Sequence, residues 1–335
     1  MHRKISFAPA LLALPFFISC GVQAQTHSAS TATPASATTS APAPVPPWSQ
    51  GRNNPATDRG YSFPVADIDN IPDLHGNPTD ARLVLFIGGN QFFVLPQLIA
   101  GFEAQHPELR GHIFYETLPP GILRAQMAAN GTLTLGNFTL HVAPDVMEAG
   151  LRALQAMQQK QLVTAPVAYA TNNLAILVRA GNPKGIHSLR DLGRADLRLS
   201  MPNPAWEGVA RQIEASLRKA GGAALEQSVY QSKVQSGSTF LTHIHHRETP
   251  MRILAGQADA GVVWASEAKF QEQIGNPLQG IAIPAEQNTT AIYAAAVVRG
   301  AAHTQAAQAW IAYLQSPQAQ AIYRSFGFAP YAKEH

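Results

Sequence analysis

The strongest constraint on this chain is the alternation of strand and helix patterns from Arg82 onward. Leu83–Ile87 is an unbroken apolar run, which is typical of a strand covered on both faces. After it, Leu95, Leu98 and Phe102 recur at helical spacing. Further strand-like runs cover 112–116, 169–179, 197–201, 260–264 and 281–298, and one more ends near 147, with helical patterns between them. This order predicts an α/β fold with mostly parallel strands.

Several helix boundaries are predicted from local chemistry. The turn 118–121 opens one helix, and Gly221-Gly222 should end the helix over 206–219. Pro250 suits the first turn of another helix, with Thr249 as its cap. Residues 306–323 read as one long amphipathic helix.

Composition excludes several classes of protein. The chain has 335 residues, of which 46% are hydrophobic and 13% charged, and a formal net charge of +3. That is enough apolar material for a large core, unlike a disordered chain. The small net charge excludes a strongly basic nucleic-acid binder, so no nucleic-acid partner is expected. Cys20 is the single cysteine, which excludes an intrachain disulfide, a cysteine-rich zinc site and an iron–sulfur cluster.

Residues 1–24 have the features of an export signal. A basic start precedes an apolar run from Ile5 to Ile18, which is too short for a membrane span of about 20 residues. Two processing sites fit. Cleavage after Ala24 would leave Gln25 first, whereas Phe17-Ile18-Ser19-Cys20-Gly21 resembles a lipobox, with a lipoprotein signal over 1–19 and Cys20 as the lipidation candidate. Either way we expect an exported protein.

The segment after the leader is predicted to be a disordered tether over 25–60, because it is rich in Ala, Ser, Thr and Pro and cannot offset its ordering entropy. Residues 48–80 are polar and carry Asp67, Asp69, Asp73 and Asp80. The order Asp67-Ile68-Asp69-Asn70 lacks the glycine and the distal glutamate of a calcium loop. We interpret residues 48–80 as a solvated lead-in to the folded part.

Three loops between a predicted strand and a helix point to an anion site: Gly88-Gly89-Asn90-Gln91, Thr117 to Gly121, and Met201 to Gly208. In open α/β sheets, ligands bind beyond the carboxyl ends of the strands. The helix N-termini there offer unpaired N–H groups and partial positive charge. Asn90 and Gln91 add neutral donors. The alternative is that any α/β protein repeats this pattern.

Catalytic motifs are absent from the sequence, which carries no nucleophile elbow, Walker loop or His-Glu-x-x-His, so we predict no enzyme and no cofactor. Glu116 and Glu207 could form a carboxylate pair, although solvent-facing glutamates are the commoner explanation. The one dense titratable cluster runs from His243 to Glu248. His243, His245 and Glu248 are metal-ligand candidates, whereas His246 and Arg247, just before a helix, would suit an anion.

Four segments resemble the periplasmic solute-binding proteins of the molybdate-binding type. They are a hinge-strand segment over 169–174, an Asn-Pro segment over 201–208, a Gly-x-Ala-Asp-x-Gly-x-Val signature over 256–264 with Trp264 in place of a tyrosine, and a closing helix over 307–328. The resemblance covers about 82–330. It implies a type II, two-lobed α/β fold of the Venus-flytrap kind, with a mixed sheet in each lobe and two crossing hinge strands.

The resemblance also implies boundaries, partners and site residues. Lobe one would comprise 81–168 plus 285–335, and lobe two 169–284. The protein would be a periplasmic monomer that captures a molybdate- or tungstate-like oxyanion for an ABC permease, with membrane contact only through a lipid on Cys20. The alternatives are a metal or metal-chelate module, or a sensor or adhesin on the same fold. The expected ligand-binding residues are Gly89, Asn90, Gln91, Pro120, Gly121, Trp206, Glu207, Gly208, His246, Arg247 and Trp264.

Overall fold

The computed structural model describes residues 73–332 except 136, 137 and 244, and these lie within one compact unit of the chain, 45–335. The predicted leader, tether and Cys20 lie outside the described residues. Among the described helices, none combines the length and apolar composition that a bilayer crossing requires.

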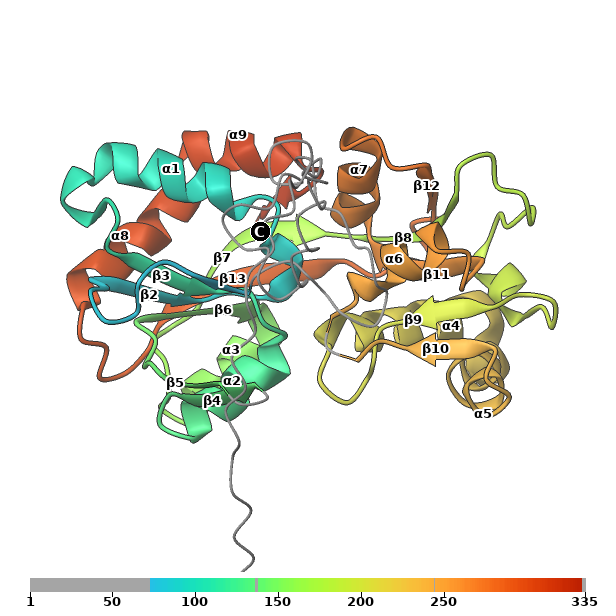
Figure 1. The fold of residues 1–335 in the computed structure, drawn as a ribbon, viewed down its shortest axis with the longest axis horizontal. Helices are drawn as coiled ribbons and strands as arrows, with labels where there is room; N and C mark the ends of the chain where they lie inside the picture. Colours follow the sequence, from blue (N-terminus) through green and yellow to red (C-terminus); the bar gives the residue numbers. More distant parts are fainter. Residues whose placement is uncertain (1–72, 136–137, 244, 333–335) are drawn as a thin grey trace, which may run out of the picture. The chain divides into compact units, whose positions relative to one another are not determined.

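The fold has two halves, each built on its own sheet. The first half is built on a seven-stranded mixed sheet, to which strands from both ends of the described chain belong (Figure 1). Its strands lie in the order β1 (Leu74–His75), β3 (Ile113–Glu116), β2 (Leu83–Phe86), β6 (Val146–Gly150), β13 (Ala291–Val297), β7 (Val167–Asn172) and β14 (Ala329–Pro330). β2 pairs in parallel with β3 and β6, and the other pairs are antiparallel.

Helices cover both faces of this sheet, which explains why β2 is apolar throughout. Leu83 and Leu85 pack in one cluster with α1 (Leu95–Gln105), α8 (Thr304–Leu314) and α9 (Pro317–Ser325). Val84 and Phe86 point the other way, into a second cluster with α2 (Pro120–Ala128) and α3 (Leu151–Gln159). The two groups of helices lie on opposite sides of the sheet in Figure 1. A small hairpin of β4 (Thr132–Leu135) and β5 (Phe138–His141) lies beside α2.

The second half contains a five-stranded sheet in the order β10 (Thr239–Leu241), β9 (Leu199–Met201), β11 (Ala260–Trp264), β8 (Leu174–Arg179) and β12 (Leu278–Ala282). Its helices are α4 (Gly208–Gln227), the short α5 (Lys233–Gln235), α6 (Glu248–Leu254) and α7 (Ala265–Gln273). The type II fold predicted by the resemblance, with two mixed sheets, is confirmed.

Two chain connections join the sheets, from β7 to β8 and from β12 to β13. At each connection the sequence predicts a single continuous strand where the structure has two. The predicted strand 169–179 is β7 followed by β8, which belong to different sheets. The run 281–298 is likewise split between β12 and β13. The Asn288 side chain, on the return connection, donates to Leu174 O at 2.9 Å and accepts from Leu174 N at 3.0 Å. These two bonds hold the start of β8 beside the return connection.

Other boundaries also differ from expectation. β6 begins at Val146 rather than ending near it, and the predicted helix 306–323 is two helices. Ser316 caps the second of these by accepting from Ala319 N, and Pro317 follows at its first position. α6 begins at Glu248, so Thr249 lies inside it rather than capping it. The break at Gly221-Gly222 is confirmed by their non-helical backbone, although helical structure resumes beyond it to Gln227.

Candidate functional site

A cleft of about 960 Å³ is lined by residues of both halves. Its wall is formed by the loop after β2, the end of β11, part of β13, the first turns of α2 and α3, and the N-terminal half of α4. Of the residues predicted to bind a ligand, all except Gly121 and Arg247 line this cleft. Contact between these residues and a ligand stays a prediction.

Asn90 and Gln91 are held by internal hydrogen bonds rather than left as free donors. Asn90 Nδ2 donates to the Tyr293 hydroxyl at 2.6 Å. Gln91 Nε2 donates to the Tyr169 hydroxyl at 2.9 Å, and Gln91 Oε1 accepts from Tyr323 at 2.8 Å. These bonds fix the short 3₁₀ turn Gly89–Gln91 at the end of β2. The turn therefore presents mainly its backbone to the cleft.

Glycine is required at two places where the halves approach each other. A Cβ atom on Gly89 would lie 2.7 Å from Thr117 O and 2.8 Å from the His245 ring. A Cβ atom on Gly121 would lie 2.8 Å from Trp206 O and 3.1 Å from Trp206 Cα. Gly121 therefore lies behind the cleft wall, where it lets α2 pack closely against the loop that precedes α4.

Glu207 and His246 form a buried charged group beneath the third loop. Glu207 accepts from Asn203 N at 2.9 Å and from the Thr242 hydroxyl, and its other carboxylate oxygen lies 3.2 Å from His246 Nδ1. His246 Nε2 lies 3.2 Å from Glu267. Burial alone would lower the pKa of His246, but the two carboxylates outweigh it and raise the pKa to about 9. His246 is therefore a cation at neutral pH.

The suggested carboxylate pair of Glu116 and Glu207 is not formed. Glu116 is fully buried at the end of β3, where it accepts from Gln126 Nε2 at 3.0 Å. Burial raises the pKa of Glu116 to about 7, against the opposing hydrogen bond from Gln126 and with a contribution from the charge of Asp73. Glu207 instead bonds to residues of the second half, so the two carboxylates have separate partners.

Asp73 and Arg247 are the main corrections to the predicted roles. Asp73, predicted to be solvated, accepts from Arg247 Nη2 at 2.5 Å, and its other carboxylate oxygen lies 3.0 Å from His245 Nε2. Its main chain and side chain also bond to Thr117. Burial would raise the pKa of Asp73, but Arg247 and His245 hold it well below its ordinary value. Arg247 is fully buried against Phe92, with its guanidinium carbon 4.8 Å from the ring centroid. This cluster, the Asp73 clasp, joins the two halves, and of its three charged members only His245 lines the cleft.

The described remainder of the predicted lead-in departs from expectation only at Leu74 and His75. Leu74 and His75 form β1, which pairs with the end of β3 at the edge of the sheet. Asp80 does remain exposed, with His112 Nδ1 at 3.0 Å. Asp67 and Asp69 lie outside the described residues. The lead-in therefore joins the fold from Asp73 onward.

Sequence reasoning missed four basic residues that line the cleft. They are Arg124 on α2, Arg152 on α3, and Arg211 and Lys219 on α4. The available signal was position, because Arg124 and Arg211 each follow a predicted loop by about one helical turn. The acidic residue on the same wall, Glu207, is balanced by His246. The wall therefore carries a clear excess of positive charge.

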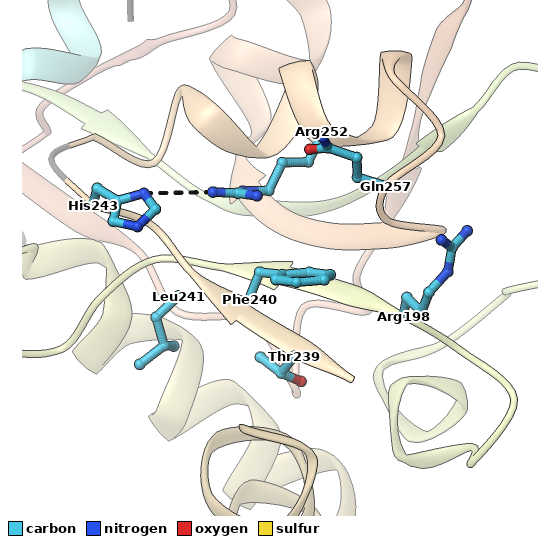
Figure 2. A pocket seen from close by; sticks show the side chains of 7 residues that line it. All are labelled: Arg198, Thr239, Phe240, Leu241, His243, Arg252 and Gln257. Carbon is cyan, nitrogen blue, oxygen red and sulfur yellow. Dashed lines mark hydrogen bonds between the residues drawn. The ribbon is translucent and has the colours of Figure 1, made fainter. Parts of the chain in front are cut away.

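The three metal-ligand candidates do not come together as one site in the part of the chain that the structure describes. There, no group of three or more His, Cys, Asp or Glu residues could hold a metal ion. His243 lies beside Glu248 at 3.2 Å, whereas His245 turns to Asp73. His243 lines a separate hollow of about 780 Å³ in the second half (Figure 2). There, Arg252 Nη2 lies 3.5 Å from His243 Nδ1. The sequence cluster is thus divided among different partners.

Comparisons with known proteins agree with this architecture. The chain is 26% identical over 166 residues to the molybdate-binding protein ModA of Mycobacterium tuberculosis, which is 49% of this chain and 56% of that protein. It thus spans about half the length of this curated relative. The molybdate-binding protein of Azotobacter vinelandii superposes with a TM-score of 0.59 and 15% identity, covering 75% of this chain and all of the other. The sulfate-binding protein SubI of M. tuberculosis superposes with a TM-score of 0.57 and 20% identity, covering 75% of this chain and 86% of the other.

These likenesses confirm the resemblance to the molybdate-binding type. The family model of the bacterial extracellular solute-binding proteins matches residues 83–329. That match covers both sheets except β1 and Pro330, and it includes every residue that lines the cleft. The chain belongs to the bacterial extracellular solute-binding proteins, a family of binding proteins for transport rather than of enzymes.

Proposed function

We propose that this protein is an exported binding protein that captures a small anion in the cleft between its halves and delivers it to the permease of an ABC importer. The observation that carries the proposal is the charge of the cleft wall. Arg124, Arg152, Arg211 and Lys219 line it, while Glu207 is balanced by His246. A concave wall of one sign attracts a ligand of the opposite sign.

The backbone supports the same ligand class. α2, α3 and α4 all begin at the cleft, so their first N–H groups add partial positive charge. The relatives with similar folds are named for molybdate and sulfate, which are both oxyanions. An oxyanion is the first ligand class to test, with the predicted loops at Gly89–Gln91 and Trp206–Gly208 as its contacts.

The two connections between the sheets suggest how binding acts on the protein. The β7–β8 and β12–β13 connections are the covalent links on which one half can turn relative to the other. An anion that contacts both halves stabilises the arrangement in which they close on it. The closed form is then the one that an importer would recognise.

Thermal unfolding with an anion panel tests this function. We expect molybdate, tungstate, sulfate or thiosulfate to raise the melting temperature, with sodium chloride at equal ionic strength as the control. A ligand at 100 times its Kd stabilises by about 2.7 kcal/mol. For a domain of this size, that corresponds to a rise of about 5–10 °C. A melting temperature that no anion in the panel moves would contradict anion capture.

Transport and attachment need their own measurements. If the protein serves an importer, deleting its gene should abolish high-affinity uptake of the anion that binds in vitro. Anion binding with unchanged uptake would instead indicate a sensor on the same fold. For the lipid anchor, Cys20→Ala should release the protein from the membrane fraction, and an unchanged distribution would exclude acylation of Cys20.

A further inference from the structure

Two arginines face the cleft from opposite halves of the protein. Arg124 lies on α2, one turn beyond Gly121, and Arg211 lies on α4, one turn beyond its first residue, Gly208. The backbone of Gly121 packs against Trp206, immediately before α4. The first turns of α2 and α4 are therefore neighbours, and both arginines are exposed residues of the cleft wall.

Neither guanidinium group has a protein counter-ion among the described residues. Glu214 is the acidic side chain nearest along α4, and the charge of Arg211 acts on it without forming an ion pair. Arg218, on the same helix, shows the contrast. It forms a bidentate pair with Glu226, with Nη2 at 2.6 Å from Oε1. The cleft arginines thus keep their charge available for a ligand.

The two positive charges act on each other across the cleft. Partial burial lowers the pKa of Arg124, and the charge of Arg211 lowers it further. An anion between two guanidinium groups relieves this repulsion and can accept paired hydrogen bonds from each. Carboxylate, phosphate and sulfonate groups all have the oxygen geometry for such pairs.

The arginines also lie apart from the predicted oxyanion loops. One helical turn is about 5.4 Å long, so their Cα atoms start that far beyond the loop residues at the helix N-termini. The cleft encloses about 960 Å³, whereas a five-atom oxyanion occupies the space of only a few water molecules, at about 30 Å³ each. One oxyanion at the loops leaves both the arginines and most of the cleft unfilled.

We propose that Arg124 and Arg211 form a second anion subsite, and that the ligand is a small organic molecule with two anionic groups. One group would bind at the loops Gly89–Gln91 and Trp206–Gly208, and the other between the two arginines. The molecule would then contact both halves at two points. This inference rests on the proposed function of anion capture.

Calorimetric titration with matched ligands tests the second subsite. The two-anion probes are phosphoglycolate, sulfoacetate and succinate, and their single-anion counterparts are inorganic phosphate, sulfate and acetate. For the wild type, we expect at least one two-anion probe to bind tenfold or more tighter than its counterpart. Arg124→Gln and Arg211→Gln should each weaken that probe at least tenfold, while changing the Kd of a single oxyanion less than threefold.

Arg218→Gln is the matched control. It removes the same charge as Arg211→Gln from the same helix, α4, but at a position outside the cleft wall. It should leave every Kd unchanged. Circular dichroism and the melting temperature without anion show that the variants fold. Arg124→Gln should melt at the same temperature as the wild type or higher, since it removes a repulsion.

The outcomes separate the two proposals. If no anion of either kind binds, anion capture itself fails. If single oxyanions bind tightly and no two-anion probe exceeds its counterpart, the second subsite is overturned while anion capture stands. Equal weakening of both ligand kinds by the arginine variants would also overturn it, because that result indicates only a general loss of charge.

Discussion

Replacement of Glu116 by glutamine should stabilise this protein at neutral pH and have a smaller effect in acid. Glu116 is fully buried, and one of its carboxylate oxygens has no hydrogen-bond partner. Burial raises its pKa from 4.5 to about 7. Because the folded state binds the proton more tightly than the unfolded state, the stability that Glu116 contributes is complete below pH 4.5. It is lost as the pH rises through 7.

The size of the effect follows from this change in pKa. A rise from 4.5 to about 7 corresponds to about 3 kcal/mol at high pH, at about 1.4 kcal/mol for each tenfold change in proton affinity. Between pH 5.5 and pH 8 the loss is about 2 kcal/mol. Glutamine has the same shape and never ionises, and its amide oxygen can still accept from Gln126. The stability of Glu116→Gln relative to the wild type should therefore grow by about 2 kcal/mol over that range.

Urea unfolding of both proteins at pH 5.5, 6.5, 7.5 and 8 measures this difference. Other titrating groups, including His246, are common to both proteins and cancel. Glu148→Gln is the control, because Glu148 is equally buried but accepts hydrogen bonds at 2.7 Å from both Trp310 and Tyr169. An amide nitrogen there faces donors, so that variant should be destabilised, although less at high pH because burial also raises the pKa of Glu148 to about 6. A constant difference between Glu116→Gln and the wild type from pH 5.5 to 8 would refute the reasoning.

Three further predictions concern the contacts between and within the halves. Asp73→Asn should destabilise by about 3 kcal/mol in urea unfolding because it breaks a buried ion pair with Arg247, whereas Asp80→Asn, which touches an exposed pair, should cost less than about 1 kcal/mol. Equal costs would contradict a role for the Asp73 clasp. Gly121→Ala should lower the melting temperature, since its Cβ would lie 2.8 Å from Trp206 O, whereas Gly208→Ala meets no atom within 4 Å and should be neutral or stabilising. The stability contributed by His246, whose folded pKa is raised to about 9, is complete below pH 6.5 and should be lost as the pH rises through 9; His246→Gln should remove that alkaline loss, and an unchanged pH profile would count against the buried charged group.

Patterns confined to one segment were predictable from the sequence. The apolar run at β2 indicated a strand covered on both faces, and alternate residues do pack into two separate clusters. The strand 260–264 was predicted with the bounds that the structure shows. The loops after the strands were located because glycine, proline and helical spacing are local signals. The family was identified from four such segments in the correct order, and the match over 83–329 confirms it.

Features that join distant segments were decided only by the tertiary structure. Nothing near Asp73 in the sequence indicates that it meets Arg247, which is 174 residues away. The cluster His243 to Glu248 offered metal-ligand candidates because its members are close in sequence. In the fold, His243 stays beside Glu248, whereas His245 and His246 turn to Asp73 and Glu207. Arg124 and Arg211 belong to separate helices, and only the fold brings both of them to the cleft wall. The physical reason is that periodicity and turn chemistry report the neighbours along the chain, whereas charge pairing and cleft lining depend on how the connections between the two sheets bring separate helices together.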